Sequence, residues 1–305
     1  MPEDLQWIDR PAPLPTRPDD GHKGTFGRVG LLAGSPGMLG AAILCARAAL
    51  RAGAGSVLCS LPDEQRDAFT VAVPAAMTTV RRSGDELESA DAVVIGPGLG
   101  GSGGPESAAN PRSQSVRSVL GPFVRSAFAR FSDRSVVLDA DGLNAISPLP
   151  TDRPLLDPAS DPKVVLTPHP GEAARLLGVT VPEVQSGREN ALSALIERSG
   201  AIVVLKGANT LVGHGSRRFR NRSGNSGLGT AGSGDVLAGV LGALLCEPMD
   251  PFEAACHAVD LHGRAGDLVA AGLSRRGVCA EDLPDAVAVT LREDEKIVEG
   301  GSESA

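Results

Sequence analysis

The stretch GNSGLGTAGSGDVLAGVLGALLC, residues 224–246, decides the fold. It opens as a glycine-rich run and continues from Asp235 as a predicted helix, with apolar residues spaced to form one helical face. A glycine loop that leads into a buried helix start presents unpaired backbone N–H groups and the positive end of the helix dipole. The stretch therefore predicts a site for an anion, in particular a phosphate.

Asp235 is a negatively charged residue placed beside this anion site. Its carboxylate can act as a base that takes a proton from a hydroxyl about to meet a phosphoryl group. It can equally cap the helix, because Asp is favoured in a first helical turn. The residue by itself favours neither interpretation.

Outward from this stretch, short apolar segments alternate with helical ones. The predicted strands are residues 29–33, 56–60, 92–95, 136–138, 164–166, 202–205 and 217–221. The predicted helices are residues 40–53, 115–131, 182–199, 251–271 and 281–292, with two more beginning at Pro170 and Asp235. Strands that are apolar throughout indicate a parallel sheet covered on both faces. We expect a three-layer α/β/α sandwich with a mostly parallel central sheet.

The organisation along the chain is simple. Residues 1–20 are rich in proline and are predicted to form a surface arm. Residues 21–293 show no internal linker and are expected to form a single domain. The acidic tail, residues 294–305, is predicted to be disordered.

Composition excludes several classes of partner. The net charge of −8 argues against nucleic acid and anionic membrane surfaces. The five cysteines are scattered singly, which indicates free thiols in a reducing compartment. We see no signal peptide and no apolar run long enough to span a bilayer, so we expect a cytoplasmic location.

Polar residues follow the predicted strands, at the edge of a parallel sheet where ligands gather. They are Gly34 and Ser35, the glycine loop 96–101, Asp139, Asp141 and Asn144, His169, and Lys206. The two acids could hold magnesium through water or bond nearby loop N–H groups. The prolines that flank His169 favour a positioned side chain. His257 and His262 are predicted to lie on a helix surface, and no His or Cys spacing predicts direct metal ligation.

Taken together, these motifs resemble a known family. The segments HKGTFGRVGLLAGS, GAA with ARAALRAGAG, GPGLG, DADGLN, TPHPGE, KGANT and GSGDVLAG follow one another from about residue 22 to 290. This series resembles the carbohydrate-kinase-like NAD(P)H-hydrate dehydratases of the ribokinase-like fold. Such enzymes repair NADH or NADPH whose nicotinamide ring has added water, the (6S) hydrates NADHX and NADPHX. A nucleotide phosphorylates the ring hydroxyl, and elimination of phosphate restores the ring.

The resemblance also implies roles for individual residues. The hydrate would be bound by Ala41, Gly98 or Gly100, His169 and Asp235. The adenine nucleotide, ADP more than ATP, would be bound by Lys206, Gly207, Ala208, Asn209, Thr210 and Gly234. Backbone N–H groups of Gly232, Ser233 and Gly234 would stabilise the moving phosphoryl group. Asp235 becomes the catalytic base, and the family further implies Mg²⁺ dependence and a homotetramer.

The chain departs from many relatives in two respects. About twenty residues precede the first motif, where bacterial relatives often carry an epimerase domain, so we expect a separate NAD(P)HX epimerase to act beside this chain. Ser233 stands where many relatives have threonine. Two alternatives remain: a small-molecule kinase of the same fold, of the hydroxyethylthiazole or pyridoxal kinase type, and a non-catalytic nucleotide-binding protein.

Overall fold

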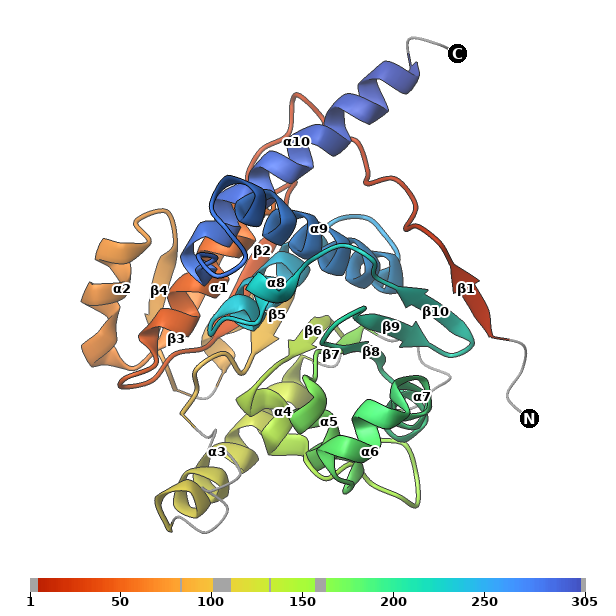
Figure 1. Cartoon of the computed structure of the whole chain (residues 1–305). Coiled ribbons are helices and arrows are strands. Elements are labelled where there is room, and N and C mark those ends of the chain that lie inside the picture. The colour runs from red at the N-terminus through yellow and green to blue at the C-terminus, as the bar shows by residue number, and fades with distance from the viewer. Residues whose placement is uncertain (1–4, 83, 101–110, 132, 157–162, 303–305) are drawn as a thin grey trace.

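The computed structural model describes residues 5–82, 84–100, 111–131, 133–156 and 163–302. Within them, ten strands form one sheet in the order β1-β10-β9-β8-β7-β6-β5-β2-β3-β4 (Figure 1). The strands are β1 (Gln6–Ile8), β2 (Arg28–Leu32), β3 (Ser56–Leu61), β4 (Met77–Val80), β5 (Ala92–Ile95), β6 (Ser135–Leu138), β7 (Val164–Leu166), β8 (Ile202–Leu205), β9 (Leu211–His214) and β10 (Arg217–Arg220).

Most neighbouring strands run parallel. The block from β4 through β8 is parallel throughout, with registers such as Val93 opposite Val136 and Val137 opposite Val165. Strand β9 pairs antiparallel with both β8 and β10, while β1 adds to β10 in the parallel sense. The mostly parallel central sheet is therefore confirmed, with an antiparallel hairpin near one edge.

Helices cover the two faces of this sheet. They are α1 (Leu39–Arg51), α2 (Arg66–Ala72), α3 (Pro111–Arg130), α4 (Asp141–Ile146), α5 (Pro170–Leu177), α6 (Val181–Ser186), α7 (Arg188–Ser199), α8 (Ser233–Leu244), α9 (Pro251–Gly272) and α10 (Leu283–Ser302). Helices α1, α8, α9 and α10 lie on one side, and α3 to α7 lie on the other (Figure 1). The predicted three-layer arrangement is confirmed.

Alternating side chains of the strands fill one core on each face. Val94 and Val137 pack in the core under α1, α8 and α9, whereas Val93 and Val136 pack in the core under α3 to α7. All four are fully buried, which explains why the strands read as continuous apolar runs. Helix α8 lies directly against α1, since a Cβ at Gly239 would collide with the backbone carbonyl of Cys45. The glycines of the central helix thus permit this close packing.

Several boundaries differ from the prediction. The region 182–199 forms two helices, α6 and α7, because the chain leaves helical geometry at Gly187 (φ −141°, ψ 55°). The arm is not entirely irregular, because β1 pairs with β10 through Gln6, Trp7 and Ile8. The tail predicted to be disordered from residue 294 instead continues α10 as far as Ser302. Strands β4 and β9 and helices α2 and α4 were not predicted.

The parallel strands bring their carboxyl ends to a common edge. There the loops after β2, β5, β6, β7 and β8 meet the amino-terminal end of α8, which is where a ligand site of this architecture is expected. None of the helices in the described part of the chain combines the length and apolar character that a membrane span requires.

Candidate active site

The amino-terminal end of α8 is open. Gly232 occupies the N-cap position in a left-handed conformation (φ 90°), and no side chain caps the helix. A Cβ at Gly232 would approach Leu44 to 2.5 Å and Ala280 to 2.9 Å, so a glycine is required on both conformational and steric grounds. The helix begins at Ser233, two residues earlier than predicted. The backbone N–H of Ser233 donates to the carbonyl of Thr230 at 3.4 Å, whereas the N–H groups of Gly234 and Asp235 have no partner within the helix. The geometry suits a bound anion.

Asp235 lies in the first turn of α8 with an unusual ionisation. Burial, followed by the negative charge of Asp139, raises the pKa of the Asp235 carboxyl to about 7, although Lys206 opposes the shift. A carboxylate with a pKa near neutrality can both accept and release a proton at physiological pH. Because the helix has no side-chain cap, the capping interpretation has no hydrogen bond to support it, and the geometry favours the base.

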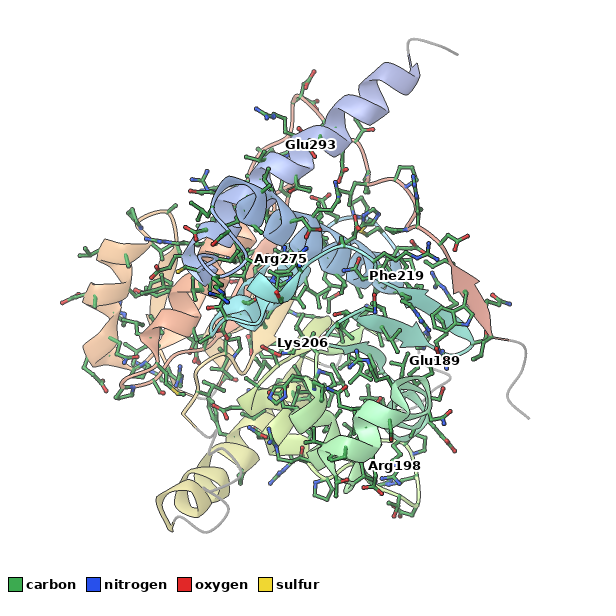
Figure 2. All side chains as sticks on the ribbon, in the orientation of Figure 1. Glu189, Arg198, Lys206, Phe219, Arg275 and Glu293 are labelled. Atoms are coloured by element: carbon green, nitrogen blue, oxygen red, sulfur yellow. The ribbon has the colours of Figure 1, made fainter. Side chains whose placement is uncertain are left out.

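Lys206 follows β8 and points towards this helix start. Its Nζ lies 2.6 Å from Oδ1 of Asp139 and 3.8 Å from Oε2 of Glu172. A Cβ at Gly234 would be 3.3 Å from the same Nζ, so the ammonium lies against the anion site (Figure 2). Burial alone would lower the pKa of Lys206, but Asp139 and then Glu172 raise it above its ordinary value. Lys206 is therefore a permanent positive charge beside the predicted phosphate.

Asp139 orients this lysine from the end of β6. Its side chain is buried, and its Oδ1 accepts hydrogen bonds from Lys206 Nζ at 2.6 Å and from Thr167 Oγ1 at 2.7 Å. Thr167 follows β7 and Lys206 follows β8, so the ends of these two strands supply the donors to one carboxylate oxygen at the end of β6. Asp139 thus acts as the counterion of Lys206.

His169 and Glu172 form a capping box at the start of α5. The backbone N–H of Gly171 donates to Nδ1 of His169, and Oε2 of Glu172 accepts from the backbone N–H of His169 at 2.8 Å. Partial burial, then the charges of Lys206 and Arg175, lower the pKa of His169 to about 4. Burial raises the pKa of Glu172. His169 is therefore a neutral, half-exposed and positioned side chain, as the flanking prolines predicted.

The GPGLG loop packs on the start of α1. Gly98 and Gly100 both have left-handed φ angles, 63° and 90°. A Cβ at Gly98 would lie 2.9 Å from the Cβ of Ala41, and one at Gly100 would lie 2.8 Å from Oγ of Ser35. The predicted hydrate-binding residues Ala41, Gly98 and Gly100 are thus brought together. Helix α1 also reaches the acidic cluster, since Asp235 contributes, after burial, to raising the pKa of Cys45.

The KGANT loop, residues 206–210, divides between two surroundings. Lys206 faces the acidic cluster, whereas Ala208 and Asn209 line a surface hollow of about 370 Å³ together with the loop between α6 and α7. Asn209 adopts a positive φ of 50°, and Thr210 Oγ1 donates to the carbonyl of Gly207 at 2.9 Å. The structure therefore presents the loop both to the phosphate site and to an adjacent hollow.

The chain is similar to known proteins over most of its length. A family model described as NAD(P)H-hydrate dehydratase matches residues 29–288. The chain belongs to this family. The family's ribokinase-like fold, expected from the motifs, is also found in solved structural neighbours.

Individual relatives agree with this assignment. The chain is 39% identical over 281 residues to the ADP-dependent (S)-NAD(P)H-hydrate dehydratase of Neisseria meningitidis serogroup B, covering 90% of this chain and 89% of that protein. It is 38% identical to the bifunctional NAD(P)H-hydrate repair enzyme Nnr of Escherichia coli, over 88% of this chain and 48% of the enzyme, so it spans about half of that relative. It also matches the ADP/ATP-dependent NAD(P)H-hydrate dehydratase of Bacillus subtilis, co-crystallised with ATP and Mg²⁺, with a TM-score of 0.76, 30% identity and coverage of 93% and 95%.

The sequence did not predict the contacts of Arg188 or the burial of His257 and His262. Arg188 at the start of α7 donates to the carbonyls of Leu205 (3.0 Å) and Lys206 (3.2 Å), so it holds the start of the KGANT loop in place. His257 and His262 are both buried, which corrects the prediction that they lie on the helix surface. Both rings are buried because α9 is covered on several sides, by strands of the sheet, by α8 and by α10. The five-residue spacing of the two histidines does not reveal this tertiary packing.

The acidic side chains at the strand ends decide whether the protein can ligate a metal ion directly. Among the described residues, no group of three His, Cys, Asp or Glu side chains is arranged to hold a metal ion. Asp139 is engaged with Lys206, and Glu172 is engaged with Lys206 and the backbone N–H of His169. Any magnesium ion would therefore take most of its ligands from nucleotide phosphates and water.

Proposed function

We propose that this chain is an ADP-dependent (S)-NAD(P)H-hydrate dehydratase, which restores NADH or NADPH from the (6S) hydrate and converts ADP to AMP and phosphate. The observation that carries the proposal is Asp235, a carboxyl whose pKa is raised to about 7, placed at an open helix start in a chain of this family. A base and an anion site side by side suit transfer of a phosphoryl group to a hydroxyl.

In the proposed reaction Asp235 takes the proton of the ring hydroxyl, and the hydroxyl oxygen attacks the β-phosphorus of ADP. The N–H groups of Gly232, Ser233 and Gly234 then stabilise the charge on the moving phosphoryl group. Lys206, held by Asp139, adds a fixed positive charge at the same place. Elimination of phosphate from the phosphorylated ring restores the dihydropyridine, and AMP is released.

The two substrates are assigned to opposite sides of Asp235. The hydrate lies against Ala41, Gly98 and Gly100, with His169 at its rim; a neutral imidazole there can donate or accept one hydrogen bond. The nucleotide extends over the KGANT loop, residues 206–210, and Gly234, with Mg²⁺ accompanying its phosphates to neutralise charge. A homotetramer, and a separate epimerase that supplies the S epimer, belong to the same proposal.

The alternative, a small-molecule kinase of the same fold, differs in its product. A kinase would leave a stable phosphorylated compound, whereas the dehydratase releases free phosphate and reduced nicotinamide. The match to the family model across residues 29–288 favours the dehydratase.

The proposal is tested by incubating the chain with (6S)-NADHX, Mg²⁺ and either ADP or ATP. Absorbance of the reduced nicotinamide should rise, and one phosphate should be released for each NADH formed, faster with ADP than with ATP. A folded protein that yields no reduced nicotinamide with either nucleotide would contradict the proposal. If a phosphorylated hydrate accumulated and no inorganic phosphate were released, the protein would be a kinase instead.

A further inference from the structure

The side chain of Arg81 connects the ends of three neighbouring strands. Arg81 directly follows β4, which lies beside β3, and β3 lies beside β2 in the sheet (Figure 1). Its Nη2 donates to the carbonyls of Gly34 at 2.6 Å and Ser60 at 3.1 Å, and also to the carbonyl of Ala33. Ala33 and Gly34 follow β2, and Ser60 belongs to β3. The guanidinium therefore reaches from the edge of the sheet across β3 to the loop after β2.

The loop after β2 also supports the GPGLG loop. The backbone N–H of Gly34 donates to the carbonyl of Pro97 at 2.8 Å. Gly100 lies against Ser35, whose Oγ would be 2.8 Å from a Cβ at that glycine. Gly34 thus uses its carbonyl for Arg81 and its N–H for the glycine loop. A displacement of Gly34 is consequently passed on to the loop.

The contacts of Arg81 are charge-assisted hydrogen bonds. Burial lowers the pKa of Arg81, but a guanidinium stays protonated in a protein. Hydrogen bonds from a charged donor are roughly twice as strong as neutral ones. The oxygens of Glu86 are engaged elsewhere, since they accept from Oγ of Ser60 at 2.6 Å and from the backbone N–H of Gly84 at 3.0 Å. The guanidinium is therefore held in place by its carbonyl contacts.

The arrangement around Gly34 leaves two buried polar atoms unpaired. Within the part of the chain that the structure describes, neither Nε of Arg81 nor Oγ of Ser35 has a hydrogen-bond partner. Such atoms are uncommon in folded proteins, because an unpaired buried polar group is costly. Departures of this kind are expected where function, and not stability alone, shapes the structure.

We propose that Arg81 is a positioning residue for the GPGLG loop, residues 96–100: it fixes the carbonyl of Gly34, and Gly34 in turn fixes the carbonyl of Pro97. That this loop binds the hydrate rests on the proposed function. The role of Arg81 rests on the two contacts of Gly34. The KGANT loop, residues 206–210, should not depend on Arg81, because β5, β6 and β7 separate β8 from β2 in the sheet.

The first test is Arg81→Met, which removes the donors and keeps a long side chain. The KM for (6S)-NADHX should rise roughly tenfold, the effect of one lost hydrogen bond to a charged group, whereas kcat and the affinity for ADP should stay within about twofold of the wild type. Arg81→Lys keeps a charged donor of up to three hydrogen bonds, so its KM should return most of the way to that of the wild type.

A second measurement does not depend on any substrate. In the absence of ligands, hydrogen exchange at the amide of Gly34 reports how firmly the two loops are joined, and exchange at Val203 in β8 reports global stability. Relative to Val203, the Gly34 amide should exchange roughly tenfold faster in Arg81→Met, for the same loss of a hydrogen bond. In Arg81→Lys it should exchange near the wild-type rate.

The matched control is Arg66→Met at the same edge of the sheet. Arg66 begins α2, and its side chain donates to Oγ1 of Thr78 in β4 at 3.3 Å and to Oδ1 of Asp63 at 3.0 Å. Neither contact involves the loop after β2. This variant should lower the melting temperature but leave the KM for the hydrate and the relative exchange of Gly34 unchanged. If Arg81→Met does not fold, Arg81→Gln, whose side chain is shorter, provides the same comparison.

The outcomes separate the inference from the proposed function. A folded Arg81→Met variant with a wild-type KM, or with wild-type exchange at Gly34, would overturn the role of Arg81. A loss that Arg81→Lys does not reduce would overturn it as well. A wild-type protein that produces no NADH from the hydrate would overturn the proposed function, and exchange at Gly34 would then decide the role of Arg81 by itself.

Discussion

Two charged clusters of this protein differ in the way their charges are matched. At the candidate active site, Asp139, Glu172 and Asp235 surround a single ammonium, that of Lys206. The three acids cannot all be ionised at low cost beside one positive charge, and burial adds to that cost. The proton held by Asp235 near neutral pH is the result.

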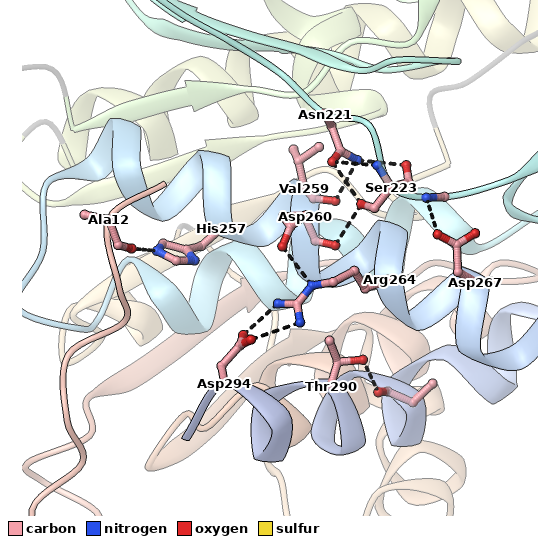
Figure 3. Close-up of polar contacts among 12 residues, drawn as sticks. Ala12, Asn221, Ser223, His257, Val259, Asp260, Arg264, Asp267, Thr290 and Asp294 are labelled. Carbon is pink, nitrogen blue, oxygen red and sulfur yellow. Dashed lines mark hydrogen bonds and ion pairs between the residues drawn. The ribbon is translucent and has the colours of Figure 1, made fainter. Parts of the chain in front are cut away.

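The second cluster joins α9 to α10. Arg264 donates to both oxygens of Asp294, at 2.9 and 2.6 Å, and to Asp260 at 2.8 Å (Figure 3). Burial would lower the pKa of Arg264, but these two acids raise it. The bidentate geometry provides two parallel charge-assisted hydrogen bonds between α9 and α10. At the site, by contrast, three carboxyl groups lie near the ammonium of Lys206, and the pKa of one of them, Asp235, is raised.

The largest expected effect follows from Asp235→Asn. The carboxamide keeps the shape of the side chain but accepts no proton, so turnover should fall by roughly two to four orders of magnitude. Nucleotide affinity should be retained, since a negative charge near the phosphates is removed. Steady-state kinetics and calorimetry measure both, with Asp260→Asn in the second cluster as the control. Turnover near that of the wild type would mean that Asp235 is structural.

Asp139→Asn should shift the pH dependence of turnover. After burial, Asp139 is the largest cause of the raised pKa of Asp235, so its neutralisation lowers that pKa. The acidic limb of the pH–rate profile should therefore move to lower pH, and the maximal rate should fall because Lys206 loses its counterion. Asp141→Asn, a weaker influence on Asp235, should move the limb less. An unmoved limb in Asp139→Asn would contradict the electrostatic coupling.

Arg264→Met tests the balanced cluster. Its loss leaves Asp260 and Asp294 without their shared partner, and we expect the free energy of unfolding to fall by about 1–2 kcal/mol. Turnover per folded molecule should change less than about twofold. Denaturant unfolding and activity measured on the same samples check both. A large loss of turnover at unchanged stability would place this cluster in the catalytic machinery.

A smaller effect is the contribution of the Asp235 carboxyl to the pH dependence of stability. The folded protein holds the proton of Asp235 up to about pH 7, whereas the unfolded chain releases it near the ordinary pKa of aspartate. The folded state therefore binds more protons in this window, and this carboxyl makes the protein less stable as the pH rises through it. The melting temperature of Asp235→Asn relative to the wild type should rise from pH 5 to pH 8 by a few degrees. An equal difference at both pH values would argue against the raised pKa.

The sequence predicted the central strands well, because a strand buried on both faces consists of apolar residues throughout. Strands 92–95, 164–166 and 202–205 have the predicted bounds, since each is a short apolar run followed directly by glycine (Gly96), threonine (Thr167) or lysine (Lys206). Strand β4 (Met77–Val80) lies at the sheet edge, is partly exposed and has no continuous apolar run, so the sequence pattern did not predict it. Edge strands owe their existence to a neighbour, which the local sequence does not contain.

The candidate site was predictable to a different extent. Residues at strand ends, such as Asp139, His169 and Lys206, could be foreseen, because the topology of a parallel sheet brings those ends together. The partners that act across the fold could not. The bond between His262 and Ser233 depends on how α9 packs against α8, and that between Arg188 and Lys206 depends on the break between α6 and α7. Neither is encoded in local spacing.

Asp235 is proposed to be a base whose protonation near neutral pH is set by burial and by the neighbouring charges of Asp139, Lys206 and Glu172. The most direct measurement is the initial rate of NADH formation from (6S)-NADHX with ADP and Mg²⁺, recorded from about pH 5.5 to about pH 9. We expect an acidic limb with an apparent pKa of about 7 for the wild type, and no such limb in the residual activity of Asp235→Asn. A wild-type rate that stays constant from the acidic end of that range to pH 8 would contradict it.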